Sequence, residues 1–177
     1  MQIEFSFGVC LMTPYLLDAN VFIQAKNLHY GMDFCPAFWD WLIIRNRAGN
    51  VASIEKVGDE LKGGEDELSR WAKIAGSSFF LPPKRDILPA LERTSVWVQR
   101  EKYEASAVAT FLQVADYWLI AHALTCNGIV VTHEIPSDSK RKIKIPNVCI
   151  GLGVKFVNPY EMLRRERARF VLEPHVK

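Results

Sequence analysis

Short apolar runs alternate with longer segments of helical periodicity along the chain. Strands are predicted at four of these runs, residues 15–17, 78–81, 129–132 and 155–157. The run at 129–132 is short and continuously apolar, which is typical of a central strand in a parallel sheet. The alternation of strands and helices therefore predicts an α/β fold in which helices cover both faces of a central parallel sheet.

Helices are predicted where apolar residues recur at a spacing of three to four positions. Ser53 is expected to open one of them, which Gly63 and Gly64 end, because glycine favours helix ends. Further helices are predicted at 21–27, 37–48, 65–75, 86–102, 104–112, 115–126, 147–152 and 159–170.

The length of 177 residues suits one domain with a sizeable core. No internal repeat, linker or low-complexity tract interrupts the chain, so a single domain over residues 1–177 is predicted. Residues 1–11 are apolar but lack the basic segment and cleavage site of a secretory signal. They are interpreted either as an extra edge strand, since Ile3, Phe5 and Phe7 alternate, or as an extension upstream of Met12.

Composition narrows the class of protein. Lys and Arg number 22 against 20 Asp and Glu, and this net charge of +2 neither indicates nor excludes a nucleic-acid partner. The cysteines form no CxxC pair, which argues against a zinc ribbon or a redox motif. Each lies beside apolar residues and is interpreted as a reduced core side chain of a cytoplasmic protein: Cys10, Cys35, Cys126 and Cys149. No apolar run approaches the length of a membrane span.

A carboxylate, Asp18, follows directly after the first predicted strand. A charge at the end of a buried strand costs free energy unless a partner compensates it, and ligands of α/β proteins bind beyond the carboxyl ends of strands. Asp18 is therefore a candidate site residue. The alternative is that Asp18 caps the helix that begins near Val21, since Asp and Asn both favour helix starts.

Three more acids occupy comparable positions. Asp116 opens a strongly apolar helix, and Glu134 lies just beyond the strand at 129–132. Of the acids in the helix after Ser53, Glu60 borders the apolar face, roughly 60° from Val57 on the helical wheel.

Carboxylates that converge on one place repel one another and take up protons, and a divalent cation removes this difficulty. Sites made of carboxylate oxygens select Mg²⁺ or Mn²⁺ rather than zinc. Such ions, often in pairs roughly 3.5–4 Å apart, support the hydrolysis of phosphodiesters.

The segments that carry these acids resemble the four signature blocks of the PIN-domain nucleases. They are LLDANVF, SIEKVGDEL, ADYWLIAHA and IVVTHE, in the family's order between residues 15 and 163. More narrowly, THE together with KIKIPNVC and VNPYEML resembles the DUF4411 branch of PIN-like proteins. The resemblance implies a PIN-like α/β/α sandwich with a central parallel sheet, and a ribonuclease that depends on Mg²⁺ or Mn²⁺.

The resemblance also implies residue roles. Those that match the family's metal-binding and catalytic quartet are Asp18, Glu60, Asp116 and Glu134, and those that match its polar helpers are Asn20 and Thr132. The residues alone leave Asn20 open between a helix cap and a site role. Many PIN domains have Asp where Glu134 stands. The added methylene is interpreted as a variation of the DUF4411-like branch that shifts the second metal or holds it more weakly.

A run of basic residues follows Glu134 closely: Lys140, Arg141, Lys142 and Lys144. These side chains are expected to contact RNA phosphates, since Lys and Arg bind the backbone without sequence preference, and a solvated loop is the alternative. The resemblance further implies the toxin of a prokaryotic type II toxin–antitoxin pair, with RNA as substrate, a cognate antitoxin protein as partner and a homodimer as assembly.

Two other functions stay open at this point. A phosphohydrolase of the haloacid dehalogenase type uses a strand-end Asp as nucleophile, but usually has a second Asp two residues later, where this chain has Asn20. A PIN-like fold can also be retained as a catalytically silent protein-binding module, which the intact quartet argues against.

Overall fold

The computed structural model describes residues 13–171 of the chain, and the predicted extension at 1–11 lies outside this part. Within it, five short strands form one sheet: β1 (Tyr15–Leu17), β2 (Val51–Ile54), β3 (Phe80–Leu81), β4 (Ile129–Val131) and β5 (Lys155–Val157). Their order is β3-β2-β1-β4-β5, and all four neighbouring pairs are parallel. The predicted α/β fold with a central parallel sheet is confirmed.

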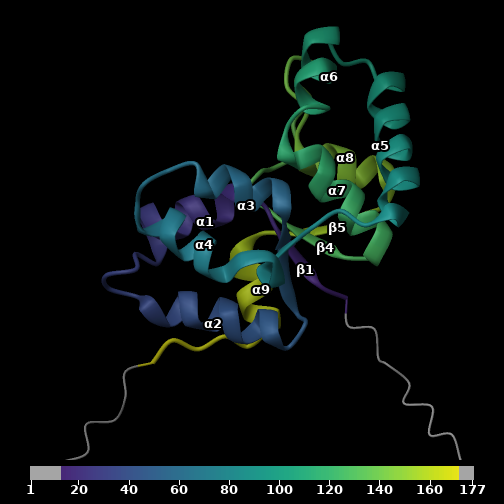
Figure 1. Cartoon of the computed structure of the whole chain (residues 1–177). Helices are drawn as coiled ribbons and strands as arrows, with labels where there is room; N and C mark the ends of the chain where they lie inside the picture. The colour runs from purple at the N-terminus through teal and green to yellow at the C-terminus, as the bar shows by residue number, and fades with distance from the viewer. Residues whose placement is uncertain (1–12, 172–177) are drawn as a thin grey trace, which may run out of the picture.

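Helices cover both faces of this sheet (Figure 1). One layer contains α1 (Ala19–Gln24), α2 (Pro36–Arg47), α3 (Glu55–Lys62), α4 (Glu67–Phe79) and α9 (Pro159–Arg165). The other contains α5 (Leu88–Arg100), α6 (Ala105–Phe111), α7 (Ala115–Cys126) and α8 (Ile145–Leu152). A π-helical turn, η1 (Ala25–His29), extends α1, and a 3₁₀ turn, η2 (Arg85–Ile87), precedes α5. The central strands are consequently buried on both sides, and Leu16, Leu17, Val130 and Val131 have no exposed surface.

The predicted helix start at Ser53 is wrong, because Val51–Ile54 is strand β2 and the helix begins at Glu55. All four residues of β2 are buried between the two layers, so the strand shows none of the alternation that marks a half-buried strand. Four residues are also too few for periodicity to separate a strand from a helical turn. The Ser53 hydroxyl is used within the sheet, where it donates a 2.6 Å hydrogen bond to the Leu17 carbonyl oxygen.

Other predictions shift at their boundaries. Helix α1 begins at Ala19 instead of near Val21, and α9 ends at Arg165 instead of Phe170. The interpretation of the cysteines as core side chains holds for Cys149, which is buried, and is wrong for Cys126, which is exposed. Cys126 is the last residue of α7, where the chain turns back toward β4.

Strand β1 lies in the middle of the sheet; β2 and β3 follow on one side of it, and β4 and β5 on the other. The strand order therefore reverses between β1 and β4. At such a switch point, α/β proteins bind ligands outside the carboxyl ends of the strands. Leu17 pairs with Val131 at the ends of these two strands, so the residues that follow, Asp18 and Thr132, emerge side by side.

Within residues 13–171, no single helix is both long and apolar enough to cross a membrane. Helices α6 and α7, which meet at a 66° bend, pass that test of length and composition only as a pair.

Packing between α3 and β3 yields a first prediction. A Cβ atom added at Gly58 would lie 2.7 Å from Cγ of Phe80. In an open helical position, Gly→Ala stabilises by up to about 1 kcal/mol. Here the Phe80 ring has to move, so we expect Gly58→Ala to lower the free energy of unfolding by about 1–3 kcal/mol.

Urea unfolding followed by circular dichroism measures this change. Gly64→Ala serves as the control, because the atom nearest to its added Cβ, Oδ1 of Asp66, is at an ordinary contact distance of 3.6 Å. A Gly58→Ala variant as stable as the wild type would show that α3 and β3 are loosely packed.

Candidate functional site

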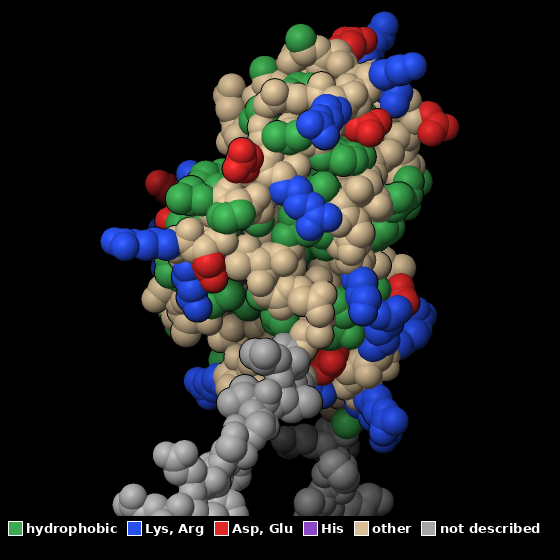
Figure 2. Space-filling model, turned by 90° about the vertical axis from the view of Figure 1, so that its right-hand side faces the viewer, with side chains coloured by type: hydrophobic (Ala, Val, Ile, Leu, Met, Phe, Trp, Pro, Cys, Tyr) green, Lys and Arg blue, Asp and Glu red, His purple; other side chains and the backbone are tan. Residues whose placement is uncertain are grey.

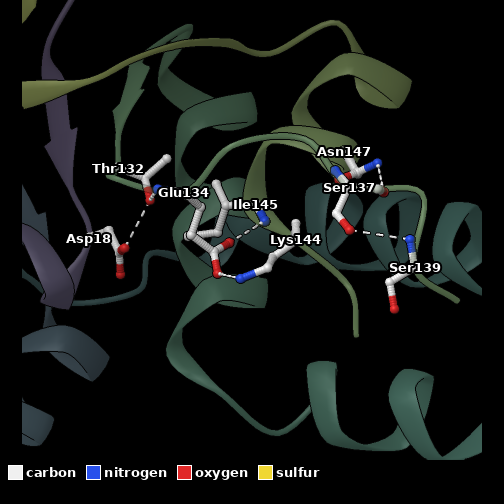
Figure 3. Close-up of polar contacts among 8 residues, drawn as sticks. All are labelled: Asp18, Thr132, Glu134, Ser137, Ser139, Lys144, Ile145 and Asn147. Carbon is white, nitrogen blue, oxygen red and sulfur yellow. Dashed lines mark hydrogen bonds and ion pairs between the residues drawn. The ribbon is translucent and has the colours of Figure 1, made fainter. Parts of the chain in front are cut away.

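Asp18 lies at the carboxyl end of β1 and is only 2% exposed. The Thr132 hydroxyl donates a 3.0 Å hydrogen bond to its Oδ2 atom (Figure 3). Burial raises the pKa of Asp18 to about 6; the hydrogen bond from Thr132 opposes this rise, and the charge of Glu134 adds to it. Asp18 is the N-cap residue of α1, and within residues 13–171 its side chain makes no capping hydrogen bond of ordinary geometry, although the backbone N–H groups of Asn20 and Ala19 act to lower its pKa. The main hydrogen-bond partner of this buried acid is Thr132.

The Thr132 hydroxyl joins the ends of β1 and β4. It donates to Asp18 and accepts a 3.1 Å hydrogen bond from the backbone N–H of Glu134. Because its proton is committed to Asp18, this buried hydroxyl fixes the orientation of the carboxylate and the start of the turn that carries Glu134. The structure thus places Thr132 beside Asp18, and its supporting role in a site stays a prediction.

Glu134 accepts hydrogen bonds at both of its carboxylate oxygens (Figure 3). Nζ of Lys144 lies 2.6 Å from Oε1, and the backbone N–H of Ile145, the first residue of α8, donates to Oε2 at 2.9 Å. The side chains of Glu134 and Lys144 are only 15% and 26% exposed, so this ion pair is shielded from solvent. Glu134 therefore ties the residues after β4 to the N-terminus of α8.

Asp116 lies in the first turn of α7. Its pKa is raised from 3.8 to about 7, mainly by burial and in addition by the charges of Asp18, Glu134 and Glu60, while Lys142 has the opposite effect. The four predicted acids come from four separate segments of the chain, and the other three are close enough to act electrostatically on Asp116. The fold thus gathers them in one region at the carboxyl ends of β1 and β4.

Asp116, Glu60 and Asn20 line the same cavity, which has a volume of about 500 Å³. The other lining residues come from α6, its link to α7 and the loop before α8: Ser106, Ala107, Thr110, Phe111, Val114, Ala115, Arg141, Lys142 and Ile143. Asn20 lies inside α1 and not at its N-cap, so the helix-cap interpretation of Asn20 is wrong. The cavity therefore brings carboxylates and an amide together with two basic residues.

The basic run does not act as one unit. Arg141 and Lys142 reach the cavity, whereas Lys144 pairs with Glu134 and Lys140 lies over the ring of Tyr103 at 5.0 Å. The face of the molecule in Figure 2 carries basic, acidic and hydrophobic side chains next to one another, in keeping with the small net charge. A ligand would therefore meet Arg141 and Lys142 inside the cavity and not a broad basic surface.

Several residues of this site carry no sequence signal. Ser106 and Thr110 of α6 line the cavity only because this helix folds over the start of α7. The pairing of Lys144 with Glu134 depends on the path of the intervening loop. That path is fixed by Asn147, whose side chain accepts from the N–H of Ser137 and donates to its carbonyl oxygen.

The donor atoms suit a hard divalent cation, because the acids offer only oxygen. Within residues 13–171, however, no three His, Cys, Asp or Glu side chains are arranged closely enough to hold a metal ion. Asp18, Glu60 and Asp116 fit a cation in their chemistry, and their role as ligands stays a prediction.

Fold and site together define a parallel α/β protein with a cavity that carries both acidic and basic residues near the carboxyl ends of its central strands. In comparisons with known proteins, the family model described as Domain of unknown function (DUF4411) matches residues 15–170. The chain therefore belongs to the DUF4411 family, as the narrower resemblance predicted. Neither a curated protein nor a solved structure matches it.

The raised pKa values predict how the stability of the metal-free protein depends on pH. The folded state keeps the Asp116 proton up to about pH 7, whereas the unfolded chain releases it near the ordinary value of 3.8. The folded state thus binds more protons between these values, so the free energy of unfolding falls as the pH rises from about 4 to about 7. Asp116→Asn should reduce this fall in the free energy of unfolding by about 2 kcal/mol. This is less than the full pKa shift would give at about 1.4 kcal/mol per pKa unit, because the site is partly solvated.

Urea unfolding in EDTA at several pH values measures the effect. Asp40→Asn is the matched control, since Asp40 is exposed on α2, away from the acids. If the free energy of unfolding of Asp116→Asn fell with pH as steeply as that of the wild type, Asp116 would not be the group that causes the pH dependence.

Proposed function

We propose that this protein is a PIN-type endoribonuclease that depends on Mg²⁺ or Mn²⁺. The observation that carries the proposal is the position of Asp116: a largely buried carboxyl group near the ends of β1 and β4, whose pKa is raised first by burial and then by the charges of three other acids. A protein keeps such mutually repelling groups together where a cation compensates them, and perturbed pKa values cluster at functional sites. The order of the four sequence blocks supports the PIN assignment.

In this proposal, Asp18, Asp116 and Glu60 hold the cation. When bound, a divalent ion of this kind supplies an activated water and offsets the charge of the phosphate. Thr132 keeps Asp18 in a fixed orientation, and the Asn20 amide faces the same cavity. Arg141 and Lys142 bind phosphates of the RNA backbone, which explains why basic and acidic residues share one cavity.

The wider setting follows from the same resemblance. The proposal includes action as the toxin of a type II toxin–antitoxin pair, with a cognate antitoxin that blocks the cavity and with a homodimer as the assembly. The large opening beside Asp116 offers such an inhibitor a place to bind.

Cleavage of single-stranded RNA tests the proposal. We expect the wild type to cut RNA with Mg²⁺ or Mn²⁺ and to stop in EDTA. Asp116→Asn should lose activity by about 100-fold or more, since even residues that only support a metal site cost about 10–100-fold when lost. Asp59→Asn is the control, because Asp59 is an exposed residue of the same helix as Glu60 and its carboxylate pairs with Lys62 at 3.9 Å. The proposal fails if wild type and Asp116→Asn cut equally, or if neither cuts once freed of any bound inhibitor.

Metal-dependent stability separates the nuclease from a silent protein-binding module. Mn²⁺ at about 100 times its Kd should raise the free energy of unfolding by roughly 2.7 kcal/mol. Thermal unfolding with and without Mn²⁺ measures this rise, with Asp116→Asn as the variant that should lose it. An unchanged melting temperature of the wild type would favour the module.

A further inference from the structure

Glu134 differs from the other three acids in that a protein cation already neutralises it. Lys144 lies 2.6 Å from Oε1 of Glu134, whereas within residues 13–171 no Lys, Arg or His comes within ion-pair distance of Asp18, Glu60 or Asp116. We infer that Glu134 is a positioning residue and not a metal ligand in this chain, and that the site takes one divalent cation through the other three acids. The inference rests on the proposed function and refines it.

The first argument is geometric. A carboxylate oxygen has two lone pairs, and each oxygen of Glu134 already directs one of them at a donor within the protein. A cation bound at Oε1 would also lie next to the Lys144 ammonium group, and like charges at such short distances in a shielded site repel strongly. The Lys144 ammonium group therefore already supplies the positive charge beside Glu134.

The second argument comes from the loop that follows Glu134. Residues 135–144 are attached to α8 at two places: Glu134 binds Lys144 and the N–H of Ile145, and the Asn147 side chain binds the backbone of Ser137 (Figure 3). Between these attachments, the Lys140 carbonyl oxygen accepts a hydrogen bond from the N–H of Glu104, just before α6. The contacts of Glu134 thus belong to a framework that sets Arg141 and Lys142 at the cavity.

The length of the side chain fits this role. In the resembling nucleases an Asp is common at this position, and a shorter carboxylate extends less far from the strand end. Glu carries one more methylene, which lets Glu134 extend from the turn after β4 to the first N–H of α8 while its backbone N–H stays bound to Thr132. A role of the Glu134 carboxylate in holding the loop at 135–144, instead of an ion, explains why this chain has Glu and not Asp at this position.

Mn²⁺ titration by calorimetry, with free Mn²⁺ followed by electron paramagnetic resonance, tests the inference. We expect one Mn²⁺ per wild-type chain. Glu134→Gln should keep that Mn²⁺ with its Kd within about threefold, whereas Asp116→Asn should weaken it by about 30-fold or more, as loss of a metal ligand does. Two Mn²⁺ per wild-type chain, or a Glu134→Gln variant weakened as much as Asp116→Asn, would overturn the inference and leave the nuclease proposal standing.

A second readout follows from the positioning role. A fluorescein-labelled single-stranded oligoribonucleotide should bind Glu134→Gln about 5–10-fold more weakly than the wild type, and KM for its cleavage should rise with little change in kcat, because the phosphate-binding Arg141 and Lys142 are misplaced. An unchanged KM with a lower kcat would assign Glu134 to the metal instead. If the wild type binds no Mn²⁺, both the inference and the proposed function fail. The wild-type stoichiometry decides the question even if Glu134→Gln does not fold.

Discussion

The hydrogen bond from the Thr132 hydroxyl to Asp18 is the contact on which the site depends. A carboxylate that is almost fully buried loses most of its hydration, and this loss is costly unless the group is hydrogen-bonded. Thr132 supplies that bond from the neighbouring strand, and the register that pairs Leu17 with Val131 places the two residues at the same level. One polar contact thus joins the halves of the sheet and orients the most buried of the four acids.

The fold keeps opposite charges apart within a small volume. Glu60 of α3 and Asp116 of α7 line the cavity, whereas its basic residues come from the loop before α8. Within residues 13–171, Arg141 and Lys142 form no ion pair with these two acids, although the charge of Lys142 lowers the pKa of Asp116, so both basic residues can meet an anionic ligand. Lys144, from the same loop, does neutralise Glu134. The path of a single loop therefore determines which acids remain available to a ligand.

Much of this could be predicted from the sequence, and the failures have physical reasons. Asp18 and Asp116 stand out because a charge beside a buried apolar run is unusual at any position, whatever the fold. Strand β2 was missed because burial on both faces removes the alternation that marks a strand. The pairing of Glu134 with Lys144 could not be predicted, since it depends on a turn that Asn147 stabilises through the backbone of Ser137. Periodicity describes single elements and contains no information on such loop paths.

The strand order also determines when the site comes into being during synthesis. Strand β1 pairs with β4, which is translated more than a hundred residues later, and the contacts of Glu134 require the start of α8. Contacts between distant segments form late, and the N-terminal part of a growing chain emerges from the ribosome first. A nascent chain that has exposed only β1, β2 and β3 carries Asp18 and Glu60 but lacks both Asp116 and the hydroxyl that orients Asp18. Whatever chemistry the cavity performs, it is withheld until the start of α8 has left the ribosome.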